Sequence, residues 1–277
     1  MFKTILIASA AVLAGLSPAF AGYFDLDEAV AGHPDTTWAT LVRQIVPDLN
    51  AEGVARTVID LRYLVDLGDG DPPPVPQLPL SLSSVVAEPI EVEGRTLTAM
   101  LVDLGPAEGW AVNVAALALF DENLTLLDVV NVGQDRLNTL RLPHLRISET
   151  SEALLTYSEH GNSNQVYGAY GLIMVRDGTF QVIDTFSTLD DRWCGHLRTQ
   201  SLAFDSPPAG PGFWPIRAAI TDRLADPDLT EDCGDEIVLP GFETTCSVTY
   251  AWSAAMGLYV ADGDSLDAFY ALNEARY

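Results

Sequence analysis

The chain has 277 residues and is strongly acidic, with 39 Asp and Glu against 14 Lys and Arg and a net charge of −25. A field of this sign repels nucleic-acid phosphates and anionic lipids, so neither is an expected partner. Cations or a basic protein are the partners that this charge favours. The preferred interpretation of the charge itself is that acidic side chains spread over the surface serve solubility.

Lysine occurs once, at Lys3, and its absence elsewhere excludes several kinds of chemistry. Schiff-base and pyridoxal enzymes, the Ser-Lys dyad and the phosphate-binding loop each need a lysine. The chain also lacks a Gly-x-Ser-x-Gly elbow, a His-Glu-x-x-His helix and a Cys-x-x-Cys pair. We therefore predict no cofactor, no metal site and no catalytic residue.

Residues 1–21 have the pattern of a cleavable secretion signal. Lys3 supplies a positive charge, residues 4–16 are apolar, and small residues at Ala19 and Ala21 suit signal peptidase. The apolar run is shorter than the roughly 20 residues of a membrane-spanning helix. We expect cleavage after Ala21, a periplasmic or secreted protein, and no integral membrane segment after cleavage.

Residues 22–65 are predicted to form a helical N-terminal segment. One face of a 3.6-residue period holds four apolar side chains: Trp38, Leu41, Val42 and Ile45. The apolar spacing within residues 54–65 predicts a second helix. Residues 66–80 are predicted to be a linker, because their prolines favour an extended backbone and cannot join the interior of a sheet.

Residues 81–277 are predicted to form a β-rich domain with a short C-terminal helix. Turn residues separate apolar runs in three consecutive hairpins, at residues 92–95, 120–124 and 176–179. The pattern predicts an α+β, β-rich fold: an antiparallel sheet of consecutive hairpins with N-terminal helices and a C-terminal helix. The alternative is a small propeller-like all-β fold, which a weak internal repeat would support.

Three cysteines predict one disulfide and one free thiol in an exported protein. Cys246 alternates with the apolar Val248 and Tyr250, which places it on the inner face of a strand as a small hydrophobic side chain. Cys194 and Cys233 both lie in polar segments rich in turn residues. We predict the bridge Cys194–Cys233, with Cys233–Cys246 as the second pairing.

The polar run 158–165 is the preferred candidate for ligand binding. Its members include an acid, an imidazole and two amides: Glu159, His160, Asn162 and Asn164. They lie between two predicted strands, where binding loops are usually mounted. The competing interpretation is a solvated hairpin loop of turn-forming residues.

A second candidate site surrounds Cys194 and His196, with Asp191 nearby. Residues two apart on a strand share a face, so a metal site or a thiolate–imidazole pair is geometrically allowed. Oxidation of Cys194 in a disulfide is the preferred interpretation. An aromatic ligand surface including Trp193 is the further option, against the default of core packing.

The sequence supports two functions of different classes. The first is an exported non-catalytic binding, accessory or envelope-associated protein of unknown ligand. The alternative is a secreted hydrolase or metal-dependent enzyme that uses His160 and His196 with Asp191 or Glu159. The enzyme requires both imidazoles and a carboxylate within about 5 Å of one another in one cleft.

Overall fold

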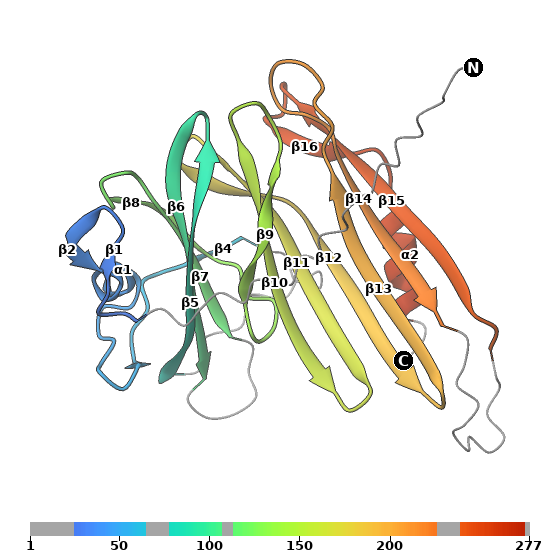
Figure 1. The fold of residues 1–277 in the computed structure, drawn as a ribbon, viewed down its shortest axis with the longest axis horizontal. Coiled ribbons are helices and arrows are strands. Elements are labelled where there is room, and N and C mark those ends of the chain that lie inside the picture. The colour runs from blue at the N-terminus through green and yellow to red at the C-terminus, as the bar shows by residue number, and fades with distance from the viewer. Residues whose placement is uncertain (1–24, 65–77, 107–112, 226–238, 275–277) are drawn as a thin grey trace, which may run out of the picture.

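The computed structural model describes residues 25–64, 78–106, 113–225 and 239–274. It contains two large sheets, a small hairpin of β1 (Ala29–Val30) and β2 (His33–Thr37), and the helices α1 (Trp38–Ile45) and α2 (Ser265–Glu274). Figure 1 shows α1 at one end of the molecule and α2 at the other. The predicted β-rich, antiparallel character is confirmed. The predicted secretion signal, Cys233 and residues 66–77 of the predicted linker lie outside the described residues.

The smaller of the two sheets has six strands in the order β3-β5-β6-β7-β8-β4. Adjacent strands in this sheet are antiparallel, except for the short parallel pair of β4 and β8. Its strands are β3 (Val54–Ala55), β4 (Arg62–Tyr63), β5 (Leu80–Val92), β6 (Arg95–Pro106), β7 (Val114–Phe120) and β8 (Leu126–Asn131). Because β3 and β4 belong to the N-terminal segment, part of that segment shares one sheet with the following strands.

The larger sheet has eight antiparallel strands that are neighbours in chain order. They are β9 (Thr139–Arg146), β10 (Glu152–Asn162), β11 (Gln165–Arg176), β12 (Thr179–Trp193), β13 (His196–Asp205), β14 (Ile216–Leu224), β15 (Phe242–Ser253) and β16 (Leu258–Ala261). Continuous sheets of six and eight strands differ from a propeller, whose blades are separate four-stranded sheets. The propeller alternative is therefore wrong for the described residues.

The six-stranded sheet is the middle layer of three. On β6, Met100 and Val102 face the N-terminal segment, whereas Ala99 and Leu101 face the eight-stranded sheet. All residues of β7 are buried, which agrees with its uninterrupted apolar sequence. From the other side, Leu154, Ile173 and Phe180 of the eight-stranded sheet complete the core between the sheets.

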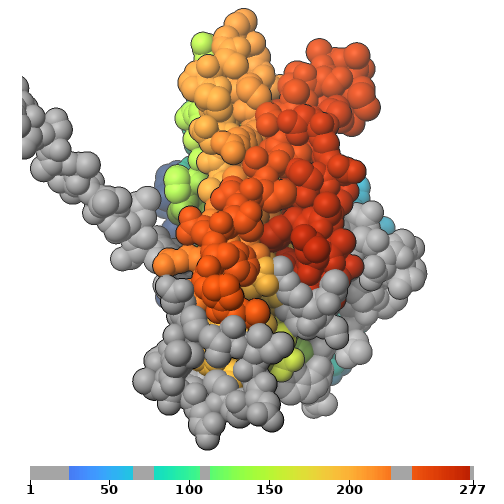
Figure 2. All heavy atoms as spheres, turned by 90° about the vertical axis from the view of Figure 1, so that its right-hand side faces the viewer, coloured from blue at the N-terminus to red at the C-terminus, as the bar shows by residue number. Residues whose placement is uncertain are grey.

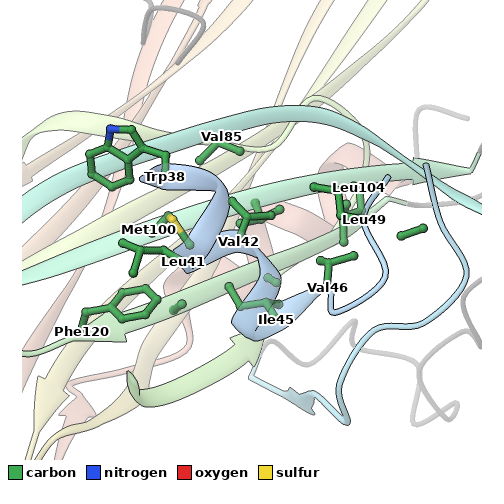
Figure 3. Close-up of a cluster of buried hydrophobic side chains, with 14 of the residues drawn as sticks. Trp38, Leu41, Val42, Ile45, Val46, Leu49, Val85, Met100, Leu104 and Phe120 are labelled. Atoms are coloured by element: carbon green, nitrogen blue, oxygen red, sulfur yellow. The ribbon is translucent and has the colours of Figure 1, made fainter. Parts of the chain in front are cut away.

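Helix α1 covers the outer face of the six-stranded sheet. Its buried side chains recur at the helical period and point onto the strands, as Figure 3 shows for Trp38, Leu41, Val42 and Ile45. They meet Met100, Leu104 and Phe120 among others. The helix predicted from this spacing is present.

The second helix predicted within residues 54–65 is wrong. This segment contains the strands β3 and β4. The carboxylate of Asp48 accepts hydrogen bonds from the backbone N–H groups of Arg56 and Thr57, and the N–H of Ile59 donates to the carbonyl of Ile45. These contacts hold the backbone in an extended path, while its apolar side chains still reach the core around α1.

The eight-stranded sheet curls around a third core that α2 closes. The ring of Phe186 on β12 lies 6.2 Å from that of Tyr250 on β15, although β13 and β14 separate these strands in the sheet. A flat sheet would place them about 14 Å apart, at roughly 4.8 Å per strand. Leu266 and Phe269 of α2 pack into this core. Figure 2 views the end of the molecule that the C-terminal elements form, from orange to red.

Side-chain hydrogen bonds replace the backbone ladder between β12 and β13 where these two strands separate. Strands β12 and β13 pair only beside their turn. Beyond this turn, the Gln200 side chain accepts a hydrogen bond from the backbone N–H of Leu189. The side-chain amides of Gln200 and of Asn273 on α2 also donate one hydrogen bond to each other. The free thiol of Cys246 packs against the same core and donates to the carbonyl of Ser265. Within the described part of the chain, neither helix is long and apolar enough to cross a membrane.

The Leu41→Ala substitution should lower the free energy of unfolding by roughly 2–5 kcal/mol, because Leu41 is fully buried in the core beneath α1. Urea denaturation measures this change. Gln44→Ala on the exposed face of the same helix is the matched control and should stay within about 0.5 kcal/mol of the wild type. Equal effects of the two substitutions would contradict the packing of α1.

Candidate functional site

A pocket of about 420 Å³ lies at the tips of two neighbouring hairpins, β10–β11 and β12–β13. Both tips reach the lower edge of the molecule in Figure 1. This volume falls in the range of small-molecule sites, roughly 300–1,000 Å³. The lining residues carry amides, a hydroxyl, two opposite charges and an indole: Asn162, Ser163, Asn164, Gln165, Asp191, Arg192 and Trp193.

Two tight turns and their register bring these residues together. Ser163 has a φ of 47°, and the second turn has φ values of 45° at Cys194 and 73° at Gly195. Positive φ is the backbone geometry of two-residue hairpin loops. Gln165 lies opposite Asp191 in the ladder, and the backbone N–H of Arg192 donates to the Asn164 carbonyl at 2.9 Å. The pocket is thus built on paired strand ends.

The indole of Trp193 rests on the ring of His196. The rings are nearly parallel, at 4° with their centres 5.1 Å apart. His196 is only 3% exposed, and both its nitrogens are used: Nδ1–H donates to the Cys194 carbonyl, and Nε2 accepts from the backbone N–H of Leu239. The second bond requires a neutral imidazole with a fixed tautomer. His196 therefore holds Trp193 in place.

A chain of polar contacts supports the pocket from the other side. The carboxylate of Asp135 forms a hydrogen bond with Nδ1 of His160. The imidazole stacks on the ring of Tyr167, with the ring centres 4.8 Å apart. The Tyr167 hydroxyl donates to Oε1 of Gln165 at 2.8 Å. Gln165 lines the pocket, so its orientation depends on these contacts.

The same series of polar contacts continues to Asp103, a buried carboxylate between the two sheets. Asn138 donates one hydrogen bond to Asp103 and another to the Asp135 carbonyl. Asn113 donates to both oxygens of Asp103. Asp103 is 1% exposed, and burial raises its pKa to about 6 although these amides favour the charged form.

The predicted ligand-binding residues divide into two pairs. Asn162 and Asn164 line the pocket. Glu159 and His160 lie farther back on β10, where Glu159 accepts a hydrogen bond from the Tyr157 hydroxyl and His160 bonds Asp135. Glu159 and His160 therefore help to build the protein around the pocket and are absent from its lining.

The structure keeps the two histidines of the predicted enzyme apart. His160 lies on β10 and His196 on β13, with β11 and β12 between them. His160 is opposite Tyr167 and thus level with Leu189, whereas His196 is opposite Trp193. At about 4.8 Å per strand and 3.3 Å per residue, the two positions are on the order of 20 Å apart. They do not share a cleft.

Asp191 lines the pocket, and Cys194 follows it in the second turn. Cys194 is disulfide-bonded, while its predicted partner Cys233 lies outside the described residues. Within the described ranges, no group of three or more His, Cys, Asp or Glu side chains is arranged to hold a metal ion.

Gln165 and Arg192 belong to the lining but were not singled out from the sequence. The pairing of β11 with β12 places the β12–β13 turn beside the β10–β11 turn and so brings these two residues into one pocket. The two turns are far apart in the chain. Trp193, which the sequence analysis considered as part of an aromatic ligand surface, lines this pocket. The signals available in the sequence were the polar run 158–165, which contains Gln165, and the polar segment before Cys194, which contains Arg192.

Comparisons with known proteins identify no relative: no family model, no curated protein and no solved structure matches the chain. The assignment of the site rests on the geometry described above.

The raised pKa of Asp103 predicts a pH-dependent stability. Its stabilising contribution is full below the unfolded value of 3.8 and is lost as the pH rises through about 6. Between pH 7 and pH 5, wild type should gain roughly 1 kcal/mol of unfolding free energy relative to Asp103→Asn. Urea denaturation of both proteins at the two pH values measures this difference. A parallel pH dependence of the two would contradict it.

Proposed function

We propose that the chain is an exported, non-catalytic α+β protein, built from consecutive hairpins, that binds a small ligand at the hairpin-tip pocket. It acts as a binding, accessory or envelope-associated protein. One observation carries the proposal: the polar loop selected from the sequence and the Asp191–Trp193 segment line a single pocket of suitable size. Its partner is a small molecule, although the acidic surface would also attract cations or a basic protein.

The way the pocket is held also favours binding. Trp193 is fixed by stacking on His196, and Gln165 is oriented by Tyr167. Side chains that are already ordered lose little conformational entropy when a ligand arrives. A rigid site at the ends of paired strands therefore suits recognition.

No observation favours the alternative hydrolase or metal-dependent enzyme. That function needs His160 and His196 in one cleft, and the strand register separates them. His196 has both nitrogens occupied by backbone groups, so neither is available as a base or a ligand. The enzyme is therefore not part of the proposal.

Export supplies the oxidising environment that the proposal needs. The bridge Cys194–Cys233 is proposed because Cys246 is a free thiol and the chain has three cysteines. Such a bridge would tie the turn beneath Trp193 to a distant part of the chain. It would restrain the same turn that His196 restrains.

Intact mass spectrometry of protein from the exporting cell tests export and the disulfide together. The expected mass is that of residues 22–277 with one disulfide. Alkylation should label one thiol before reduction and three afterwards, and Cys246→Ser should lose the label seen before reduction. A mass that retains residues 1–21 would overturn export, and three labels before reduction would overturn the bridge.

A mixed library of small polar compounds, screened by ¹H–¹⁵N NMR, tests the binding site. Binders should shift the amide signals of residues 162–165 and 191–193. Asn164→Ala should weaken binding by about fivefold or more, because a typical hydrogen bond contributes roughly 1 kcal/mol. Asn123→Ala, at the exposed turn before β8, is the matched control and should bind like wild type. Binders that shift only other regions would contradict the site.

A further inference from the structure

The pocket is balanced in charge although the protein is strongly acidic. Among its lining residues, Asp191 and Arg192 are the only charged side chains and have opposite signs. The whole chain has a net charge of −25. An ionic ligand is best served by an excess of the opposite charge at its site. The balance at these hairpin tips therefore favours a ligand without net charge.

The hydrogen-bonding groups of the pocket both donate and accept. The side-chain amides of Asn162 and Asn164 and the hydroxyl of Ser163 each offer both functions. The Nε2 group of Gln165 adds donors, because its Oε1 already accepts from Tyr167. Asp191 adds acceptors, and Arg192 adds further donors. This mixture matches a ligand whose own groups donate and accept, which is the chemistry of several adjacent hydroxyls.

The aromatic side of the pocket offers one flat apolar surface. One face of the Trp193 indole is covered by His196, and Trp193 also lines the pocket. The uncovered part of the indole is therefore what a ligand meets. A pyranose ring presents a face of C–H groups that can pack on such a surface, while its hydroxyls project outward at the rim. Indoles combine this apolar area with little loss of conformational freedom.

We propose that the pocket binds a neutral carbohydrate, with one sugar ring stacked on Trp193 and its hydroxyls bonded by Asn162, Asn164 and the Asp191–Arg192 pair. The proposal rests on the binding function proposed above and names the chemical class of its ligand. The open position at two hairpin tips suits one unit of a longer glycan, whose neighbouring sugars extend into solvent.

Isothermal titration calorimetry with defined probes tests the ligand class. The probes are maltotetraose, cellotetraose and the tetramer of N-acetylglucosamine, with spermidine and citrate as charged compounds at equal ionic strength. At least one neutral tetrasaccharide should bind and shift the Trp193 indole signal in NMR. Trp193→Ala should weaken its affinity by about tenfold or more, whereas Trp193→Phe should retain most of it.

Control variants separate the possible results. Asn123→Ala should bind the sugar like wild type, and Asn164→Ala should bind it less tightly; urea denaturation establishes that each variant is folded. If spermidine or citrate binds at the pocket and no sugar does, the carbohydrate class is overturned and the binding function stands. If sugar affinity is unchanged in both Trp193→Ala and Asn164→Ala, the sugar binds elsewhere and the proposal is overturned. If no probe and no library compound reaches the pocket, both proposals are overturned.

Discussion

Burial of the six-stranded sheet on both faces is the constraint on which the other features depend. Strand β7 has no exposed residue, so apolar layers must cover it from two sides. Helix α1 supplies one layer and the eight-stranded sheet supplies the other. Two carboxylates of the described residues are nevertheless buried: Asp222 on β14, which pairs with Arg198, and Asp103 near the end of β6.

Asp103 connects this constraint to the pocket. An isolated buried carboxylate is costly, and its cost is reduced here by amide donors from Asn113 and Asn138. Asn138 also holds the carbonyl of Asp135, whose carboxylate holds His160. Through the stacked Tyr167, this path reaches Gln165 at the pocket. These contacts thus connect the interface between the two sheets to a residue that lines the pocket.

Short-range patterns in the sequence predicted the features that depend on residues close together in the chain. The spacing of Trp38 to Ile45 predicted α1, and the polar run around Asn162 supplies part of the lining of the pocket. The same reasoning failed for residues 54–65, because side-chain bonds from Asp48 and pairing with β5 outweigh helical spacing. It also grouped Glu159 and His160 with Asn162 and Asn164, whereas only the two amides line the pocket. Only the register of β11 with β12 shows that Gln165 and Asp191 are neighbours.

The acidic surface and the pocket separate two tasks that one charge distribution could not perform together. The excess of carboxylates disfavours close contacts between copies of the protein, because like charges repel one another. A recognition site with the same excess charge would bind cations of many kinds, with little selectivity. In the proposed site, the opposite charges of Asp191 and Arg192 would avoid this, and shape, stacking on Trp193 and the arrangement of hydroxyls would discriminate between ligands. Such discrimination would need side chains that are held in place before the ligand arrives. The buried central sheet contributes to this at Gln165, through the contacts of Asp135, His160 and Tyr167.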